Sequence, residues 1–329
     1  MLETTEQIDP ERFIASLQKD YSKLSVRIRE LVHSVRCESD GVTLRLYFPA
    51  ISQGKPKILE LVNTILDYVT TFALSRTQIE SLKESYKTSS ADDFRIKCER
   101  LQREAIALFI RAQKATNRNG EAGELLLYLL TEWILKAPQI LAKMGLKTNR
   151  DMPVHGTDGI HIGYAPDKKR PCFYWGEAKL FDDVNTAISR AATSIKTALK
   201  PDSMEHEISL VARHIDAAGL SLEEKSLVLS FLDPYDDENY NRRIDVTTCL
   251  IGFNFDAFGK LDGNSDENKF RLFALSKLQE LAPLLSKALT SAGIRSRPIE
   301  VFFFPVTSVQ DLRDLFQTKI GWKNDPGSS

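Results

Sequence analysis

The sequence has few cysteines, and none of them form a recognisable ligand or disulfide pattern. Its 329 residues include four cysteines, Cys37, Cys98, Cys172 and Cys249, and no Cys-x-x-Cys pair. Such wide spacing argues against a zinc site built from one stretch of sequence and against a disulfide-stapled scaffold. The cysteines therefore indicate a chain that works in a reducing compartment.

Long hydrophobic runs are also missing. No apolar run approaches the roughly 18 residues that a membrane-spanning helix requires. The N-terminal stretch reads MLETTEQIDPERF, which is acidic and has no apolar core of the kind found in secretory signal peptides. We therefore expect a soluble, cytoplasmic protein with no membrane partner.

An excess of positive charge is the next feature that the sequence lacks. The formal net charge is -1, so the whole chain exerts no general attraction on a polyanion. Positive charge is concentrated locally, because residues 143 to 200 contain ten Lys and Arg against six Asp and Glu. A nucleic-acid surface, if the chain has one, is expected in this segment.

Several common catalytic motifs are absent as well. The sequence contains no Gly-x-x-x-x-Gly-Lys-Ser/Thr loop, no Gly-x-Gly-x-x-Gly fingerprint and no Gly-x-Ser-x-Gly elbow. These absences remove support for ATP hydrolysis, for dinucleotide chemistry and for the usual serine hydrolases.

The composition that remains, 42% hydrophobic and 27% charged, is that of a globular protein of one large or two medium domains. Residues 1–118 mix helical and strand patterns, with a hairpin signal at Asp40–Gly41, and we predict an α+β region there that is a candidate for partner binding. A loop and cap cluster at residues 117–120 predicts a boundary, followed by a second domain over residues 119–323. The Gly-Ser tail at 324–329 is predicted to be disordered.

The second domain alternates helical and strand patterns, which predicts an α/β fold with a central mixed sheet flanked by helices. Helices are expected at 121–143, where Pro138 ends or kinks the helix, at 184–200 and at 269–289, and strands at 158–165, 172–181, 244–258 and 297–306.

One strand carries charges where a buried strand should be apolar. It reads FYWGEAKLFDD, residues 173–183, and its alternation places Glu177 and Lys179 on one face, about 6.6 Å apart along the strand. Burying an unpaired charge costs several kcal/mol. These two side chains therefore require partners.

One partner comes from the neighbouring strand, which the turn PDKKRP connects to this one. If the turn closes an antiparallel hairpin with Gly163 opposite Cys172, Asp158 lies opposite Glu177. Two carboxylates about 5 Å apart repel each other, and a hard cation such as Mg²⁺, or Mn²⁺ in its place, removes the penalty. With the Lys179 ammonium beside the ion, the predicted chemistry is cleavage of a phosphodiester.

The order Asp158, an interval of nineteen positions, then Glu177-Ala178-Lys179 in a strand resembles the PD-(D/E)XK nuclease motif, with Thr157 in place of the usual Pro. Over residues 120 to 320 the sequence resembles the HamA nuclease family of Hachiman anti-phage defence systems. The resemblance implies a restriction-endonuclease-like core, Mg²⁺-dependent cleavage of DNA, and a heterodimeric complex with a superfamily 2 helicase, HamB.

In PD-(D/E)XK folds the helix before the first motif strand often adds a glutamate. This chain offers Glu121 and Glu124, and we favour Glu124 because an acid in the first turn, such as Glu121, suits the helix dipole whatever the function. The predicted metal ligands are then Glu124, Asp158 and Glu177, and Lys179 completes the catalytic set.

Contacts to the DNA backbone are expected from two neighbouring segments. The candidates are Lys168, Lys169, Arg170, Arg190, Ser194 and Lys196. A solvated turn is the simpler interpretation of the first three. Asp182 and Asp183 are expected to start the helix at 184–200.

Other functions are compatible with the same residues. A catalytically inactive, nucleic-acid-binding adaptor of a helicase complex is the main alternative, and a DNA lyase that forms a Schiff base at Lys179 is another. His155 and His161 flank Asp158, but no second histidine cluster at ligand spacing supports a histidine-metal nuclease.

Overall fold

The computed structural model describes residues 8–116, 120–147, 156–263 and 267–322. The predicted boundary at residues 118 and 119 and the predicted tail at 324–329 lie outside these residues. Within the described parts of the chain, no helix has the length and apolar character needed to cross a bilayer.

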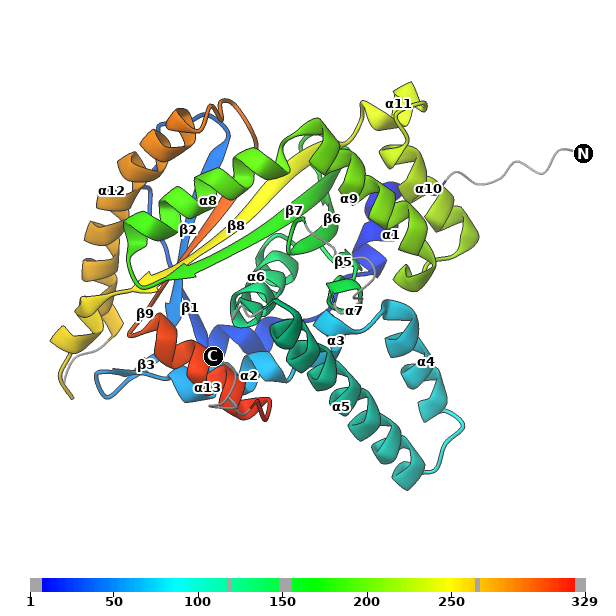
Figure 1. The fold of residues 1–329 in the computed structure, drawn as a ribbon, viewed down its shortest axis with the longest axis horizontal. Coiled ribbons are helices and arrows are strands. Elements are labelled where there is room, and N and C mark those ends of the chain that lie inside the picture. Colours follow the sequence, from blue (N-terminus) through cyan, green and yellow to red (C-terminus); the bar gives the residue numbers. More distant parts are fainter. Residues whose placement is uncertain (1–7, 117–119, 148–155, 264–266, 323–329) are drawn as a thin grey trace, which may run out of the picture.

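A seven-stranded mixed sheet forms the centre of the molecule, in the order β1-β2-β9-β8-β7-β6-β5 (Figure 1). The four central strands, β2, β9, β8 and β7, are parallel, and the strands at both edges pair antiparallel. The strands are β1 Ile28–Leu31, β2 Val42–Pro49, β5 Gln139–Leu141, β6 Gly159–Ala165, β7 Arg170–Phe181, β8 Ile244–Asn254 and β9 Ile299–Val306, with a separate pair β3 Ile51–Ser52 and β4 Lys55–Pro56. The predicted α/β class with a central mixed sheet is confirmed.

Helices cover both faces of this sheet (Figure 1). They are α1 Pro10–Ser16, α2 Ile58–Leu66, α3 Val69–Ala73, α4 Arg76–Tyr86, α5 Ala91–Thr116, α6 Glu121–Ile134, α7 Met144–Lys147, α8 Val184–Ala198, α9 Pro201–His214, α10 Leu222–Leu232, α11 Asp237–Tyr240, α12 Glu267–Ser291 and α13 Val309–Lys319. Helices α9 and α10, which the sequence pattern did not predict, lie between β7 and β8 in the chain.

The N-terminal region contributes two strands to the same sheet. Strand β2 pairs in parallel with β9, and β1 pairs antiparallel with β2, with Leu31 opposite Leu46. The hairpin signal at Asp40–Gly41 thus marks the start of β2, where Gly41 has a φ of 80°. The tight hairpin expected there is not formed, because β1 ends at Leu31 and a ten-residue connection precedes β2.

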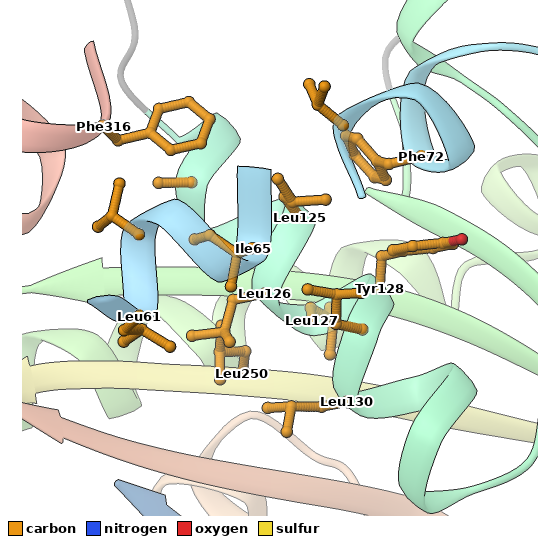
Figure 2. Packing of buried hydrophobic residues seen from close by; sticks show 14 of the residues in the cluster. Leu61, Ile65, Phe72, Leu125, Leu126, Leu127, Tyr128, Leu130, Leu250 and Phe316 are labelled. Atoms are coloured by element: carbon orange, nitrogen blue, oxygen red, sulfur yellow. The ribbon is translucent and has the colours of Figure 1, made fainter. Parts of the chain in front are cut away.

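Helix α6 is the centre of the apolar layer on one face of the sheet. Figure 2 shows Leu126 of α6 packed between Ile65 of α2 and Leu250 of β8, and Leu125, Leu127 and Leu130 belong to the same cluster. The contact of α6 with β7 is close, because a Cβ on Gly123 would lie 2.3 Å from Leu180 Cδ1. Glycine at position 123 therefore lets the helix approach the strand.

The opposite face of the sheet is covered by α8 and α12. Ala187, Ile188 and Ala191 of α8 pack with Cys249 and Ile251 of β8. A third apolar cluster joins α1, α9 and α10 to the Phe173 and Trp175 side of β7. Strand β7 is thus enclosed on both faces, which makes the charges near its C-terminal end unusual.

Candidate functional site

The predicted hairpin forms in the predicted register. Strands β6 and β7 pair antiparallel, with Gly163 opposite Cys172 and Gly159 opposite Gly176. Asp158 comes directly before β6, and its hydrogen bonds to Gly176 and Ala178 place it beside Glu177 of β7. The register is fixed because Ile160, Ile162 and the aromatic residues of β7 must share the buried face.

Asp158 is held by two backbone groups of β7. Its N–H donates to the Gly176 carbonyl over 2.7 Å, and its Oδ2 accepts from the Ala178 N–H over 2.8 Å. The carboxylate therefore has one oxygen anchored to the strand that carries Glu177. This arrangement fixes the distance between the two acidic residues more firmly than a free side chain would.

Glu177 and Lys179 form an ion pair on the face that α8 covers. The side chains are 11% and 23% exposed, and the Lys179 Nζ donates to the Glu177 Oε1. Ser194 of α8 lies near enough to Glu177 to favour its carboxylate form. Beneath the pair lies Cys249 of β8, which is directly beside Glu177 in the sheet and fully buried.

Burial and like charge act together on Glu177. Its pKa is raised because burial disfavours the carboxylate and because Asp158 repels it, and the Lys179 ammonium only partly offsets these effects. Burial lowers the pKa of Lys179, but the Glu177 and Asp158 charges more than compensate, so its pKa is raised overall. The site thus contains two acidic side chains and one firmly protonated lysine.

This donor set fits a hard divalent cation. Mg²⁺ is commonly bound by one or two carboxylates, with waters and substrate phosphates completing its shell. Asp158 and Glu177 supply two carboxylates. Burial raises the pKa of Glu177, repulsion by Asp158 raises it further, and a cation between the two carboxylates would remove that repulsion. The residues present therefore suit the ion that the sequence predicts.

A third carboxylate from α6 is not assembled with them. Among the described residues, no three Asp, Glu, His or Cys side chains lie close enough together to hold one metal ion. Helix α6 packs through Gly123 on the Ala178 and Leu180 face of β7, opposite to Glu177. Glu124 is not grouped with Asp158 and Glu177 among the described residues, and its role as a ligand stays a prediction. Glu121 is buried and accepts a hydrogen bond from Gln113 over 3.3 Å.

The basic turn lies at the other end of the hairpin. Lys168 and Lys169 are exposed in the turn between β6 and β7, eight or more strand residues from Glu177, which is about 26 Å at the usual rise. Arg170 donates to the Asn241 carbonyl over 2.7 Å. The structure does not bring these three residues into the site, and their contact with DNA stays a prediction.

The candidates on α8 are placed differently from one another. Ser194 lies near Glu177, and Arg190 lies one turn before Ser194 on α8 and is exposed. Lys196 is also exposed, two positions beyond Ser194, where a helix turns it to another side. Asp183 caps the helix by accepting from the Thr186 N–H over 2.7 Å, which confirms the predicted helix start.

His161 has a structural role. It is 2% exposed, lies beside Tyr128, and its Nδ1 hydrogen-bonds with the Ala137 carbonyl over 2.9 Å. Burial lowers its pKa, so the ring is neutral at physiological pH. His155 lies outside the described residues. His161 adds no ligand to the acidic pair.

Two residues next to the site were not predicted from the sequence. Lys143 and Glu207 form a buried ion pair against Thr157, the residue before Asp158. A signal for Glu207 was present, because it shares one face of α9 with Leu210 and Val211, where an apolar residue is expected. Nothing in the spacing of Lys143 pointed to it.

Comparison with known proteins places the chain in a family. A family model described as HamA matches residues 26–320, which includes β1, β2 and the whole candidate site. A search of curated proteins gives no match.

Proposed function

The chain belongs to the HamA family, and we propose that it is a metal-dependent nuclease that cleaves DNA as a component of a Hachiman anti-phage defence system. One observation carries the proposal. Asp158, directly before β6, hydrogen-bonds to Gly176 and Ala178 on either side of Glu177 in β7, and Lys179 pairs with Glu177 on the same face. Two acidic groups and a lysine at this spacing are the groups that metal-assisted hydrolysis of a phosphodiester requires.

Asp158 and Glu177 would hold the cation, Mg²⁺ or Mn²⁺. When bound, the ion supplies positive charge that polarises a phosphoryl oxygen and makes nearby water more acidic. Asp158 is kept in place by the Ala178 N–H, and Glu177 by Lys179. The protein's part in the reaction is to hold these groups so that they need no rearrangement when the substrate arrives.

Lys179 would act as a charged group. Its raised pKa keeps an ammonium at neutral pH, which can orient the attacking water or neutralise charge that develops on the phosphate. A Schiff-base lyase needs the opposite, a neutral amine with a lowered pKa. The environment of Lys179 therefore favours hydrolysis over the lyase alternative.

The substrate is expected to reach the site along α8. Ser194 and the exposed Arg190 offer a hydroxyl and a guanidinium for phosphate oxygens. Because the net charge of the chain is only -1, DNA binding by the isolated protein should be weak and sensitive to salt. We therefore expect a partner, a superfamily 2 helicase of the HamB kind, to deliver DNA to the nuclease.

The central test is DNA nicking by wild type, Glu177→Ala and Lys179→Ala, on plasmid and linear DNA, with and without Mg²⁺ and the helicase. Wild type should nick DNA only with Mg²⁺ or Mn²⁺, and both variants should lose at least about a hundredfold in rate. Glu300→Ala is a suitable control, because it removes a carboxylate from β9, two strands away.

Three outcomes would overturn the proposal. Equal nicking by wild type and both variants would show that the site lies elsewhere. No nicking by wild type under any condition, with DNA still bound, would favour the inactive adaptor. Borohydride trapping of a protein–DNA adduct through Lys179 would instead support the lyase.

For the partnership, native mass measurement should give a one-to-one complex with the helicase. Absence of this complex would count against delivery of DNA by the helicase.

A further inference from the structure

A buried ion pair lies directly behind Asp158. The Lys143 Nζ is 2.9 Å from each carboxylate oxygen of Glu207, and each side chain is only 2% exposed. Among the ion pairs between described residues, no other has both partners so deeply buried. Lys143 follows β5, and Glu207 comes from α9, so the pair joins distant parts of the chain.

Both charges bind the backbone of Thr157. The Thr157 N–H donates to Glu207 Oε1 over 2.7 Å, and the Lys143 ammonium donates to the Thr157 carbonyl over 2.6 Å. The peptide that follows Thr157 is also held at its other end, because the Asp158 N–H donates to the Gly176 carbonyl. The backbone that leads into Asp158 therefore has every polar group from the Thr157 N–H to the Asp158 N–H engaged.

The preceding residue makes room for this contact. Gly156 has a φ of 150°, and a Cβ built on it would lie 1.9 Å from Glu207 Oε1. Any side chain at position 156 would displace the Glu207 carboxylate from Thr157. Threonine at 157 matters for a related reason, because a proline there would have no N–H to donate.

Stability alone is a poor explanation for such a pair. Removing two charges from water costs several kcal/mol for each ion, and well-packed apolar residues of similar volume often stabilise a protein as much or more. The neighbourhood, with Leu210 and Val211 on the same face of α9, would accommodate apolar side chains. What apolar residues cannot supply is an acceptor for the Thr157 N–H and a donor for its carbonyl.

We infer that Lys143 and Glu207 are positioning residues that act through the Thr157 backbone to fix the Asp158 carboxylate beside Glu177. This inference rests on the proposed nuclease function for its purpose, since Asp158 is a proposed cation ligand. We call the Lys143–Glu207 pair and its two hydrogen bonds to the Thr157 backbone the clamp. Removing the clamp should leave the fold in place but let the backbone at Asp158 separate more often from β7. Groups that orient a metal ligand typically change metal affinity or activity by about 10- to 100-fold when they are lost.

The test compares Glu207→Gln with Glu207→Met in the full-length chain. Both variants remove the charge and keep a side chain of similar length, but only glutamine retains an acceptor for the Thr157 N–H. Urea is added to the more stable variant until the two free energies of unfolding match. Any remaining difference in hydrogen exchange or Mn²⁺ binding then reports the loss of the acceptor for the Thr157 N–H. Glu300→Met, which breaks the Arg45–Glu300 pair between β2 and β9, serves as the control.

The first readout is amide hydrogen exchange of Asp158 and Ala178 in the metal-free protein. We expect exchange to be about tenfold faster in Glu207→Met than in Glu207→Gln, with the Ile251 amide of β8 unchanged. The second is Mn²⁺ binding, followed by the electron paramagnetic resonance of the free ion. The dissociation constant should rise about tenfold in Glu207→Met, less in Glu207→Gln, and stay at the wild-type value in Glu300→Met.

Failure of the inference and failure of the proposed function give different results. Equal exchange of Asp158 and Ala178 in the two Glu207 variants would overturn the positioning role, even if wild type cleaves DNA. A wild type that neither binds Mn²⁺ nor nicks DNA would overturn the proposed function, while faster exchange in Glu207→Met would still support the clamp.

Discussion

Two ion pairs meet the Thr157–Asp158 segment, and they differ in how far they are exposed to solvent. At Glu177 and Lys179, the paired side chains are 11% and 23% exposed, and the Asp158 carboxylate repels Glu177. At Lys143 and Glu207, each side chain is only 2% exposed, and both bind the Thr157 backbone. Under the proposed function, the first group would accept a cation from solvent, whereas the second group would hold the backbone next to Asp158.

The largest expected effect comes from removing the lysine of the buried Lys143–Glu207 pair. Lys143→Met leaves Glu207 as an unpaired buried charge, and breaking a buried pair in this way costs about 3–5 kcal/mol of stability. Urea unfolding should show this loss. Lys196→Met on the exposed side of α8 is the control and should change stability by no more than about 0.5 kcal/mol. A loss below about 1 kcal/mol in Lys143→Met would show that the pair is not buried in solution.

At the site formed by Asp158, Glu177 and Lys179, removing a charge should raise stability or leave it unchanged. Asp158→Asn keeps an oxygen for the Ala178 N–H but removes the repulsion with Glu177, so in EDTA the variant should be as stable as wild type or more stable. Nicking should fall at least about a hundredfold, equivalent to about 2.7 kcal/mol of transition-state stabilisation. Thermal unfolding and plasmid nicking measure the two effects. A variant that is both less stable and still active would contradict the repulsion between Asp158 and Glu177 and the proposed role of Asp158.

The part of the molecule that the sequence predicted well is the part governed by local alternation. The register of β6 and β7 followed from matching the apolar faces around Phe173 and Trp175, and that register alone placed Asp158 beside Glu177. The helix start at Asp183 followed in the same way from capping chemistry. Both features depend on residues close together in the chain.

The features that escaped prediction depend on long-range packing. Whether Glu124 reaches the site is decided by the face of β7 on which α6 packs, which helix periodicity does not specify. The pairing of Lys143 with Glu207 requires α9 to lie against the loop after β5, more than sixty residues away. The basic turn at Lys168 seemed close to Glu177 in sequence, but an extended strand separates them.

The pH dependence of stability gives a finer test of the environment of Glu177. Because the pKa of Glu177 is raised in the folded protein, the folded state keeps its proton at pH values where the unfolded chain, near pKa 4.5, has lost it. In EDTA, the stability of wild type should therefore fall relative to Glu177→Gln as the pH rises above about 4.5 and through the raised pKa. Each unit of the shift corresponds to about 1.4 kcal/mol.

Unfolding of wild type and Glu177→Gln between pH 4 and 8 measures this difference. Lys179 remains protonated throughout the range, so it does not contribute to the slope. A difference that is constant with pH would show that Glu177 ionises normally. Saturating Mg²⁺ should flatten the curve, because a cation between Asp158 and Glu177 favours both carboxylates.

The smallest expected effect tests a third kind of charge, one that is exposed and outside both pairs. Asp183 caps α8, and its pKa is lowered because its carboxylate accepts from the Thr186 N–H. Asp183→Ala should cost about 1 kcal/mol of stability, whereas Asp183→Asn, which keeps a capping oxygen, should cost only a few tenths. Neither should change nicking at temperatures where the protein is folded, because Ser194 lies nearly three turns further along α8. A loss of nicking in Asp183→Ala but not in Asp183→Asn would mean that the start of α8 sets the position of Ser194 relative to Glu177. The cap at Asp183 would then contribute to nicking as well as to stability.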